Sequence, residues 1–488
     1  MSKLLETLKQ ENNQAFTANA ALSNRSTLNK VLDLFARGGA LRGAHADEII
    51  KLFGKAYSQD PLLATKCLFY IRDVRGGQGE RRTFKLCWDY LCRYYPETAR
   101  KNLSLVPEYG RFDEWFDCLG GNLENDVIEL TREQIKRDQE NLRAGKPISL
   151  LGKWLPSIYT SSETTQRRGK KVAVKLGLTR EDYRKVYVEV RKALQIVEQA
   201  MSAGNWGRIE FQKVPSRAAK IYRKAFLKHD KERYTAYLEA VKRGETKINA
   251  GALFPYELVQ IAMHSEDPTI ELQWKALPNY LDGQIASAIA VVDVSGSMSS
   301  GMGSVAPINI SLSLGVYLGE RLNGPFKDHF ITFSESPKLE KISGPTLHQK
   351  LMGLCRSDWG MNTNLQAVFD LVLKTAVKHK LSQSDIPGAI VIISDMQFDV
   401  CTSGNDQTNF QEIERKFKEA GYERPELIFW NVNAQTEEVP VLKDTARTKL
   451  VSGCSPSLFK SVLSGKTVTP EDYMLSVLNG ERYQKVMV

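Results

Sequence analysis

The feature that most constrains the fold is a run of small and β-branched residues, 285–292, that ends abruptly at Asp293-Val294-Ser295-Gly296-Ser297. Because the run shows no regular polar alternation, it predicts a strand buried on both faces, as in a parallel sheet. Asp293, Ser295 and Ser297 then offer one carboxylate and two hydroxyls directly after that strand, and Gly296 allows the backbone to turn. Oxygen donors without a soft ligand favour a hard cation, Mg²⁺ first and then Mn²⁺ or Ca²⁺.

Three oxygen atoms cannot fill an octahedral shell, so further ligands must come from elsewhere in the chain. Thr363 lies in a short loop before a helical pattern, and a second apolar run, 389–394, ends at Asp395. Ligands in open α/β sheets gather at the carboxyl ends of strands, so we expect Asp293 and Asp395 to lie at one edge. The alternative is a solvated turn that binds no metal. The predicted metal ligands are Asp293, Ser295, Ser297, Thr363 and Asp395.

Strand and helix patterns alternate from residue 285 onward, which is typical of a doubly wound α/β sheet. Further strands are predicted at 328–333, 388–394, 426–432 and 450–453, and helices at 307–321, 365–379, 410–420, 457–463 and 470–478.

Residues 1–284 instead predict short amphipathic helices joined by Gly and Pro turns. The first 25 residues are polar and predict a short helical start at most. Ser26 is expected to cap the next helix, and Asp60-Pro61 to open another. The last helix before the first strand of the second domain is expected near Tyr256. Stacked helical hairpins of the HEAT type are the predicted architecture, with one domain at 1–284 and a second at 285–488.

Composition excludes several classes of protein. The sequence contains no uncharged apolar stretch of about 18 residues, and its first residues carry acids and lack an apolar signal region. We therefore expect a cytoplasmic protein that does not bind membranes. The 7 cysteines are an odd number without a C-x-x-C pair, which predicts buried reduced thiols and no disulfide frame or zinc site.

Positive charge is concentrated in one segment. Residues 151–250 contain 23 Lys and Arg against 10 Asp and Glu, whereas residues 286–488 contain 20 against 22. This segregation favours a nucleic-acid-binding face, with Trp154, Tyr159, Trp206 and Tyr222 available to stack on bases. The alternative is a solvated basic surface with aromatic residues in the core. The predicted phosphate contacts are Arg72, Arg75, Arg81, Arg82, Arg167, Arg168, Lys170, Lys171, Lys213, Arg217, Lys220, Arg223 and Lys224.

The sequence offers little evidence for a catalytic site. Gly76-Gly77-Gln78-Gly79 follows a helical pattern and lacks the G-K-[ST] of a phosphate loop, so a turn between helices explains it better. Neither Ser295 nor Ser297 has a histidine within its loop to act as a base. We therefore expect no enzymatic activity.

The ligand pattern of Asp293, Ser295, Ser297, Thr363 and Asp395 resembles the metal-ion-dependent adhesion site of von Willebrand factor A domains. The resemblance implies that Ser295, Ser297 and Thr363 bind the ion directly and that Asp293 and Asp395 act partly through water. It also implies an open coordination position for an acidic group of a partner.

A helical-repeat domain followed by such an A domain resembles the TROVE family of Ro autoantigen proteins. The residues at 74–82, 213–217 and 393–397 are most similar to a less studied branch of Ro-like proteins from phages and plants. The family implies a ring of HEAT-like repeats closed by the A domain, which holds single-stranded RNA ends in its centre and small structured noncoding RNA on its rim.

We therefore expect a monomeric, non-catalytic RNA-binding scaffold of a ribonucleoprotein with Mg²⁺ on its A domain. The alternative is a metal-dependent protein-interaction adaptor that docks a partner's carboxylate and has no role with RNA.

Overall fold

The computed structural model describes residues 11–282, 287–299, 305–355, 363–399, 409–464 and 469–488. The chain forms two compact units, Met1–Thr83 with Ala250–Gln484, and Phe84–Asn249 with Lys485–Val488. This division differs from the predicted border at residue 284, because the amino-terminal helix α2 (Lys30–Arg37) packs against strand β8 (Thr448–Ser452). Within the described ranges, the structure contains no helix whose length and apolar character would allow it to cross a bilayer.

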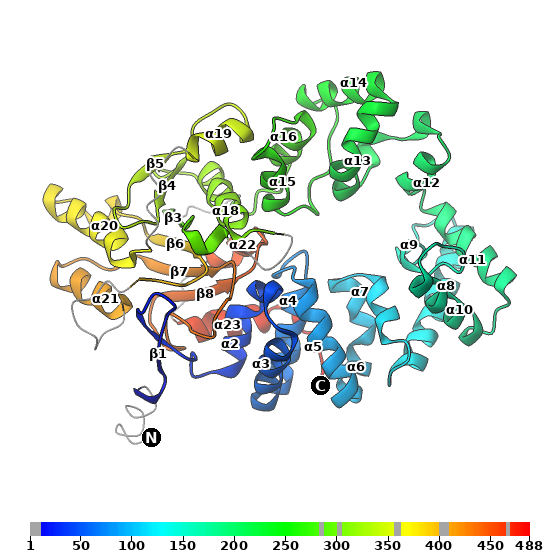
Figure 1. Ribbon diagram of the computed structural model, residues 1–488, viewed down its shortest axis with the longest axis horizontal. Helices are drawn as coiled ribbons and strands as arrows, with labels where there is room; N and C mark the ends of the chain where they lie inside the picture. The colour runs from blue at the N-terminus through cyan, green and yellow to red at the C-terminus, as the bar shows by residue number, and fades with distance from the viewer. Residues whose placement is uncertain (1–10, 283–286, 300–304, 356–362, 400–408, 465–468) are drawn as a thin grey trace. The chain divides into compact units, whose positions relative to one another are not determined.

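A six-stranded mixed sheet forms the centre of the first unit (Figure 1). The strand β5 pairs antiparallel with β4, and every other neighbouring pair is parallel. The strand order reverses between β3 and β6, so their carboxyl ends form the topological switch point where α/β sheets bind ligands. The spatial order is β5 (Leu339–Lys341), β4 (His329–Thr332), β3 (Ala288–Val292), β6 (Ala389–Ser394), β7 (Glu426–Asn431) and β8.

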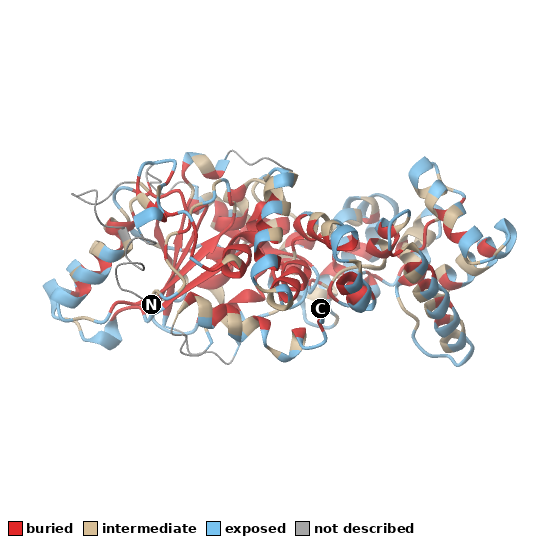
Figure 2. Ribbon diagram, turned by 90° about the horizontal axis from the view of Figure 1, so that it is seen from below, coloured by how far each residue is buried: buried red, intermediate tan, exposed pale blue. Residues whose placement is uncertain are grey.

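The strands carry apolar residues on both faces, without alternation. Both faces of the sheet are therefore covered by helices. Every residue of β3, β6 and β8 is buried, and Figure 2 shows buried strands, in red, inside the unit. Ile289 and Ile392 belong to the same core cluster as Phe369 of α20 and Phe417 of α21. The helix α18 packs against β3 through Gly315, where a Cβ atom would overlap the Val292 side chain.

The remaining helices of the first unit surround this core. Three helices begin and end at the predicted residues: α18 (Pro307–Arg321), α20 (Leu365–His379) and α23 (Pro470–Leu478). The strand β5 and the helices α16 and α19 were not predicted from the sequence. The other helices are α3 (Ala46–Gln59), α4 (Pro61–Arg72), α15 (Pro255–Ala262), α16 (Pro268–Lys275), α17 (Gly296–Ser299), α19 (Leu347–Leu354), α21 (Asn409–Glu419) and α22 (Leu458–Val462), with short 3₁₀ turns at Gly38–Gly43, Gln383–Asp385 and Glu481–Tyr483.

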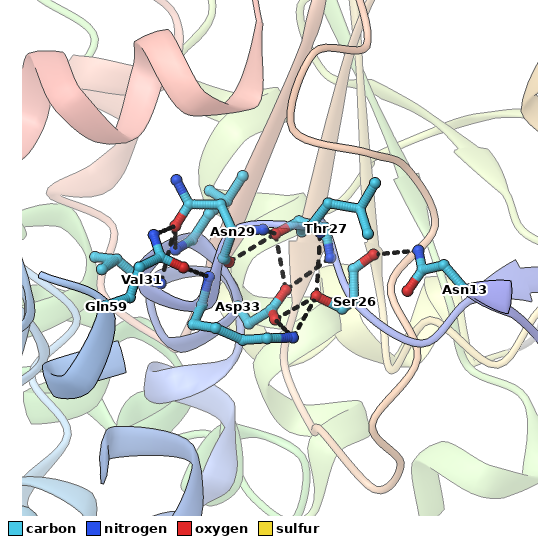
Figure 3. Close-up of polar contacts among 10 residues, drawn as sticks. Asn13, Ser26, Thr27, Asn29, Val31, Asp33 and Gln59 are labelled. Atoms are coloured by element: carbon cyan, nitrogen blue, oxygen red, sulfur yellow. Dashed lines mark hydrogen bonds and ion pairs between the residues drawn. The ribbon is translucent and has the colours of Figure 1, made fainter. Parts of the chain in front are cut away.

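The start of α2 differs from the prediction in a specific way (Figure 3). Asn29 caps the helix, because its Oδ1 accepts hydrogen bonds from the backbone N–H groups of Val31 at 2.9 Å and Leu32 at 3.1 Å. Ser26, the predicted cap, instead donates its hydroxyl to Asp33 at 2.7 Å. The predicted cap position was therefore wrong, and Ser26 organises the segment before the helix. Asp60 does cap α4, accepting from the N–H of Leu63 at 2.9 Å.

The amino-terminal segment forms a hairpin of β1 (Gln14–Phe16) and β2 (Leu22–Asn24), which was not predicted from the sequence. Residues 11 and 12 are helical, and the rest of the predicted helical start, residues 1–10, lies outside the described residues. The hairpin is held by residues far away in the sequence. Asn24 and Val439 exchange backbone hydrogen bonds of 3.1 and 2.8 Å. A short polar segment with such distant partners has no signature in its own sequence.

The second unit is helical throughout its described residues. The basic residues at 167–171 lie within α10, a helix that the sequence analysis did not identify, and α14 was also missed. The helices are α5 (Arg81–Tyr94), α6 (Pro96–Asn102), α7 (Val106–Tyr109), α8 (Glu124–Arg143), α9 (Leu151–Trp154), α10 (Glu163–Lys175), α11 (Arg180–Ala193), α12 (Val197–Ser202), α13 (Ser216–His229) and α14 (Lys231–Lys242). The 3₁₀ segments are η2 (Leu103–Leu105), η3 (Phe112–Cys118), η4 (Trp206–Arg208) and η5 (Phe211–Lys213).

Candidate functional site

Two buried carboxylates follow the neighbouring strands β3 and β6. Asp293 is 0% exposed and Asp395 is 1% exposed. The parallel pairing of the strands puts Val292 beside Ile393, so the two carboxylates leave the sheet at the same edge. Ser394 donates its hydroxyl to Asp293 Oδ2 at 2.6 Å, and the Ser295 N–H donates to Oδ1 at 2.8 Å. Asp293 is thus held rigidly at the strand end.

The electrostatics of this edge favour a cation. Burial first, and then the nearby Asp395 carboxylate, raise the pKa of Asp293 to about 6, although hydrogen bonds from Ser394 and Ser295 lower it. Burial also raises the pKa of Asp395, against the stabilising contact of Ser297. Among the described residues, no basic side chain offsets either charge. A divalent ion between two such carboxylates would relieve their desolvation and mutual repulsion.

The predicted hydroxyl ligands lie on two different segments. The hydroxyl oxygens of Ser295 and Ser297 are 3.1 Å apart at the start of α17. Thr363 is described, although residues 356–362 of its predicted loop lie outside the described ranges. Its hydroxyl donates to the backbone oxygen of Gln397 at 2.9 Å, and the Gln397 N–H donates to Asp395 Oδ1 at 3.2 Å. The structure therefore links Thr363 to the segment that follows Asp395.

One atom of this set fits a metal ligand particularly well. Asp395 Oδ2 is buried, and no described group donates a well-directed hydrogen bond to it, although Ser297 lies close enough to lower the pKa of Asp395. A buried carboxylate oxygen without such a donor is costly unless an ion binds it. The described residues contain no group of three or more His, Cys, Asp or Glu side chains suited to a metal. The predicted set has two carboxylates and depends on hydroxyls, which suits Mg²⁺ better than zinc.

Two neighbours of this edge were not predicted from the sequence. Asp399 accepts hydrogen bonds from the N–H and, at 3.3 Å, from the hydroxyl of Thr363. The amino-terminal segment contacts the same loop, because Asn19 donates to the Gln397 backbone oxygen at 2.8 Å and Thr17 donates to that of Phe398 at 2.7 Å. Asp399 was visible as a further acid close after Asp395, but the amino-terminal contact had no signal in the sequence.

The first predicted basic cluster does not form one surface. Arg72 is only 2% exposed, so it is removed from the candidates for phosphate contact. Arg75 and Arg82 are exposed and Arg81 is half-buried. Arg82 donates to the backbone oxygen of Ala44 at 2.8 Å, which gives its guanidinium a structural role.

The basic residues of α10 differ in their exposure and in their ion pairs. Arg167 and Lys170 are exposed, and the 3.9 Å ion pair of Arg167 with the exposed Glu163 is screened by solvent. Arg168 forms an ion pair of 3.0 Å with Asp117, and Lys171 pairs with Glu124. The hydrogen bond from Lys171 lowers the pKa of Glu124. Arg168 and Lys171 therefore contribute less free positive charge than Arg167 and Lys170.

The cluster around α13 contains three exposed cations. Lys213, Arg217 and Lys224 are exposed, while Lys220 and Arg223 are half-buried. Lys213 lies in η5, before the regular helix α13, which begins after Pro215. Its partner Glu210, at 2.8 Å, is itself exposed, so that ion pair is screened by solvent.

The four predicted stacking residues differ in their surroundings. Trp154 lies under the Arg111 guanidinium, 4.0 Å from it, and Trp206 stacks on His229 at 4.4 Å. Tyr222 donates to Glu198 at 3.3 Å. Tyr159 is 65% exposed, so among these four rings it offers the largest free surface to a base.

Comparisons with known proteins show what this chain is similar to, but the matching domains and protein have no known function. The model of DUF7788, a domain of unknown function, matches residues 287–486. The model of DUF2828, also a domain of unknown function, matches residues 17–109 and 159–294. The uncharacterized protein L728 of Acanthamoeba polyphaga mimivirus is 29% identical over 507 residues, which cover 96% of this chain and 87% of that protein. The chain is thus similar to this viral protein along nearly its whole length.

Proposed function

We propose that this protein is a non-catalytic scaffold that binds single-stranded RNA through the exposed cations of α10 and α13. The observation that carries the proposal is the charge of this region, where 23 Lys and Arg stand against 10 Asp and Glu between residues 151 and 250. Several of these cations, including Arg167, Lys170, Arg217 and Lys224, are exposed. Exposed Lys and Arg bind phosphates and release counterions from the nucleic acid, which drives association.

Single strands suit this surface better than a duplex does. The exposed ring of Tyr159 lies 5.6 Å from the Arg184 guanidinium, so a stacking platform and a cation occur together. Base stacking on an aromatic ring contributes about 1–3 kcal/mol per base and does not depend on sequence. We therefore propose RNA binding with strong salt dependence and weak sequence preference.

The proposal includes a hard divalent ion, Mg²⁺ first, on the first unit. Asp293, Ser295, Ser297, Thr363 and Asp395 would hold it, as the resemblance to the adhesion site of von Willebrand factor A domains implies. The ion would supply the positive charge that the two buried carboxylates lack. We further propose the ring of helical repeats and the ribonucleoprotein role that the resemblance to TROVE proteins implies. The reversal of strand order at β3 and β6 supports the proposal that the first unit contains an A domain.

Fluorescence anisotropy with a labelled oligouridine tests the RNA proposal. The triple variant Lys213→Glu/Arg217→Glu/Lys220→Glu should bind at least about tenfold more weakly and should lower the slope of log affinity against log salt by about 2. The matched control is Lys374→Glu/Lys378→Glu/Lys380→Glu, which makes the same charge change on exposed residues of the first unit. An equal loss of RNA affinity in both variants would contradict the proposal, because it would show a general effect of net charge.

A second candidate function is a metal-dependent adaptor, and the buried Asp395 Oδ2 favours it. In this case the ion would leave a coordination position for a carboxylate of a protein partner. EDTA or Asp293→Asn would then abolish partner binding. The RNA proposal predicts instead that Asp293→Asn retains most of the RNA affinity.

A further inference from the structure

The second unit contains a cavity of about 380 Å³ that the proposed function does not use. One wall is formed by α5 and the other by η3 and the turn that leads to α8. Cys92 of α5 and Cys118 at the end of η3 both line it, together with Trp88, Asp89 and Asp117. A small polar molecule that enters this cavity therefore meets two thiols from different segments.

The two thiols line the same cavity. Both are free, and each residue is 8% exposed. Their side chains are within hydrogen-bonding distance of one another. Cys87, on the same helix, is 0% exposed and does not line the cavity, and burial raises its pKa. Cys92 and Cys118 can thus be reached from the cavity, whereas Cys87 cannot.

The pair is chemically asymmetric. The contact with Cys92 stabilises the Cys118 thiolate, so the pKa of Cys118 is lowered even though burial acts against this. The pKa of Cys92 is raised, first by its hydrogen bond to Cys118 and then by burial. Because the thiolate is the nucleophile, Cys118 is the sulfur that reacts first and Cys92 is the one that remains protonated.

We propose that Cys92 and Cys118 form a reversible disulfide when a hydroperoxide enters this cavity. The Cys118 thiolate attacks one peroxide oxygen, the O–O bond breaks, and the leaving oxygen takes up a proton to become water or an alcohol. Cys118 is then a sulfenic acid. The Cys92 sulfur attacks it, the S–O bond breaks, and the released hydroxide leaves as water with the Cys92 proton. In total the two thiols lose two electrons and two protons, and hydrogen peroxide becomes two molecules of water.

The disulfide would join α5 to η3 across the cavity and constrain the chain between residues 92 and 118. A thiol reductant such as glutathione or dithiothreitol would reverse it. The disulfide proposal does not rest on the RNA proposal. None of the predicted phosphate contacts lines the cavity, although Arg168 pairs with Asp117 of its wall. The proposed disulfide also changes the expectation that all cysteines are buried, reduced thiols. Cys355 is exposed, contrary to that expectation, and Cys401 lies outside the described residues.

Peptide mapping by mass spectrometry under non-reducing conditions tests the proposal on the full-length chain. We use Cys355→Ser protein, so that the exposed thiol does not consume the oxidant, and a few equivalents of hydrogen peroxide. The expected product is a peptide pair linked through Cys92 and Cys118 that dithiothreitol separates. Oxidation should also raise the unfolding temperature by several degrees, because the cross-link restricts the unfolded chain.

Variants identify the order of the two steps. Cys92→Ser should stop at a Cys118 sulfenic acid that dimedone traps, whereas Cys118→Ser should block both products. Cys87→Ser, the matched control, should form the disulfide as the parent does. The proposal is overturned if the parent protein keeps both thiols after oxidant treatment, or if Cys87 is oxidised as fast as Cys118.

Discussion

Ser394 donates a 2.6 Å hydrogen bond to Asp293 Oδ2, so side chains at the carboxyl ends of β6 and β3 are joined directly. This contact turns one carboxylate oxygen of Asp293 toward the neighbouring strand, while the Ser295 N–H binds the other oxygen at 2.8 Å. The orientation of Asp293 is therefore set by the sheet. Groups that orient a metal ligand in this way typically change metal affinity by 10- to 100-fold when they are removed.

The first prediction concerns Ser394→Ala. Because the variant removes a hydrogen bond to a buried carboxylate, it should lower Mg²⁺ affinity about tenfold and destabilise the protein by about 1–3 kcal/mol. Isothermal titration calorimetry and urea unfolding measure the two effects. Ser313→Ala is the control, since within the described ranges this buried hydroxyl bonds to the backbone oxygen of Ile310 in its own helix and to no other group. Similar Mg²⁺ affinities in the two variants would contradict the orienting role.

The second prediction is a pH dependence of the metal-free protein. The pKa of Asp293 in the folded protein is about 6, above its usual value of about 3.9 in unfolded chains. The folded state thus binds the proton more tightly, so this group stabilises the fold fully below about pH 4 and loses that contribution as the pH rises through 6. The loss is at most about 3 kcal/mol.

Mg²⁺ should reverse this trend, because it binds the ionised carboxylates. The rise in unfolding temperature on adding Mg²⁺ should therefore increase between about pH 5 and 7. Thermal unfolding in EDTA and in Mg²⁺ across that range measures both effects, and Asp293→Asn should flatten both curves. A Mg²⁺ effect that is equal at both ends of the range would argue against ligation by Asp293.

The third prediction concerns the contact between α18 and the sheet. Gly315→Ala should destabilise the protein by about 1–3 kcal/mol, because the new Cβ atom would overlap the Val292 side chain just before Asp293. Gly353→Ala on α19 is the control, since its Cβ atom would meet only the Ser343 oxygen at 3.8 Å, an ordinary contact. Urea unfolding of both variants should separate them, and equal stabilities would show that α18 moves away without cost.

The fourth prediction separates the exposed cations of α10 from the half-buried ones. Arg167→Ala/Lys170→Ala should weaken oligouridine binding several-fold and leave stability within about 0.5 kcal/mol of wild type, since both side chains are exposed. Arg168→Ala should have a smaller effect on binding, because its guanidinium already pairs with Asp117 at 3.0 Å. Anisotropy and thermal unfolding test this, and a larger binding loss for Arg168→Ala would contradict the assignment.

Much of the first unit could be predicted because local signals agree with the fold. The helices Leu365–His379 and Pro470–Leu478 follow the caps Asn364 and Thr469, which accept hydrogen bonds from the backbone. The apolar runs of β3 and β6 end at Asp293 and Asp395, so parallel pairing was enough to bring the two acids to one edge.

Other features depend on contacts that no local pattern encodes. The β1–β2 hairpin pairs with Val439 and bonds to Phe398, so its strands exist only where the distant chain is already folded. The burial of Arg72 has a similar origin, since a charged residue in an amphipathic helix reads as surface until its neighbours are known. Charge counts located the basic segment, but they could not show that Arg168 and Lys171 have acidic partners.

The most direct test of the proposed function is photocrosslinking of single-stranded RNA that contains 4-thiouridine, followed by mass spectrometry of the crosslinked peptides. Our account predicts crosslinks to peptides from residues 159–229, with Tyr159 and the segment from Lys213 to Lys224 prominent, and their loss at high salt. Crosslinks confined to the first unit, or none under conditions where a known RNA-binding protein reacts, would contradict it.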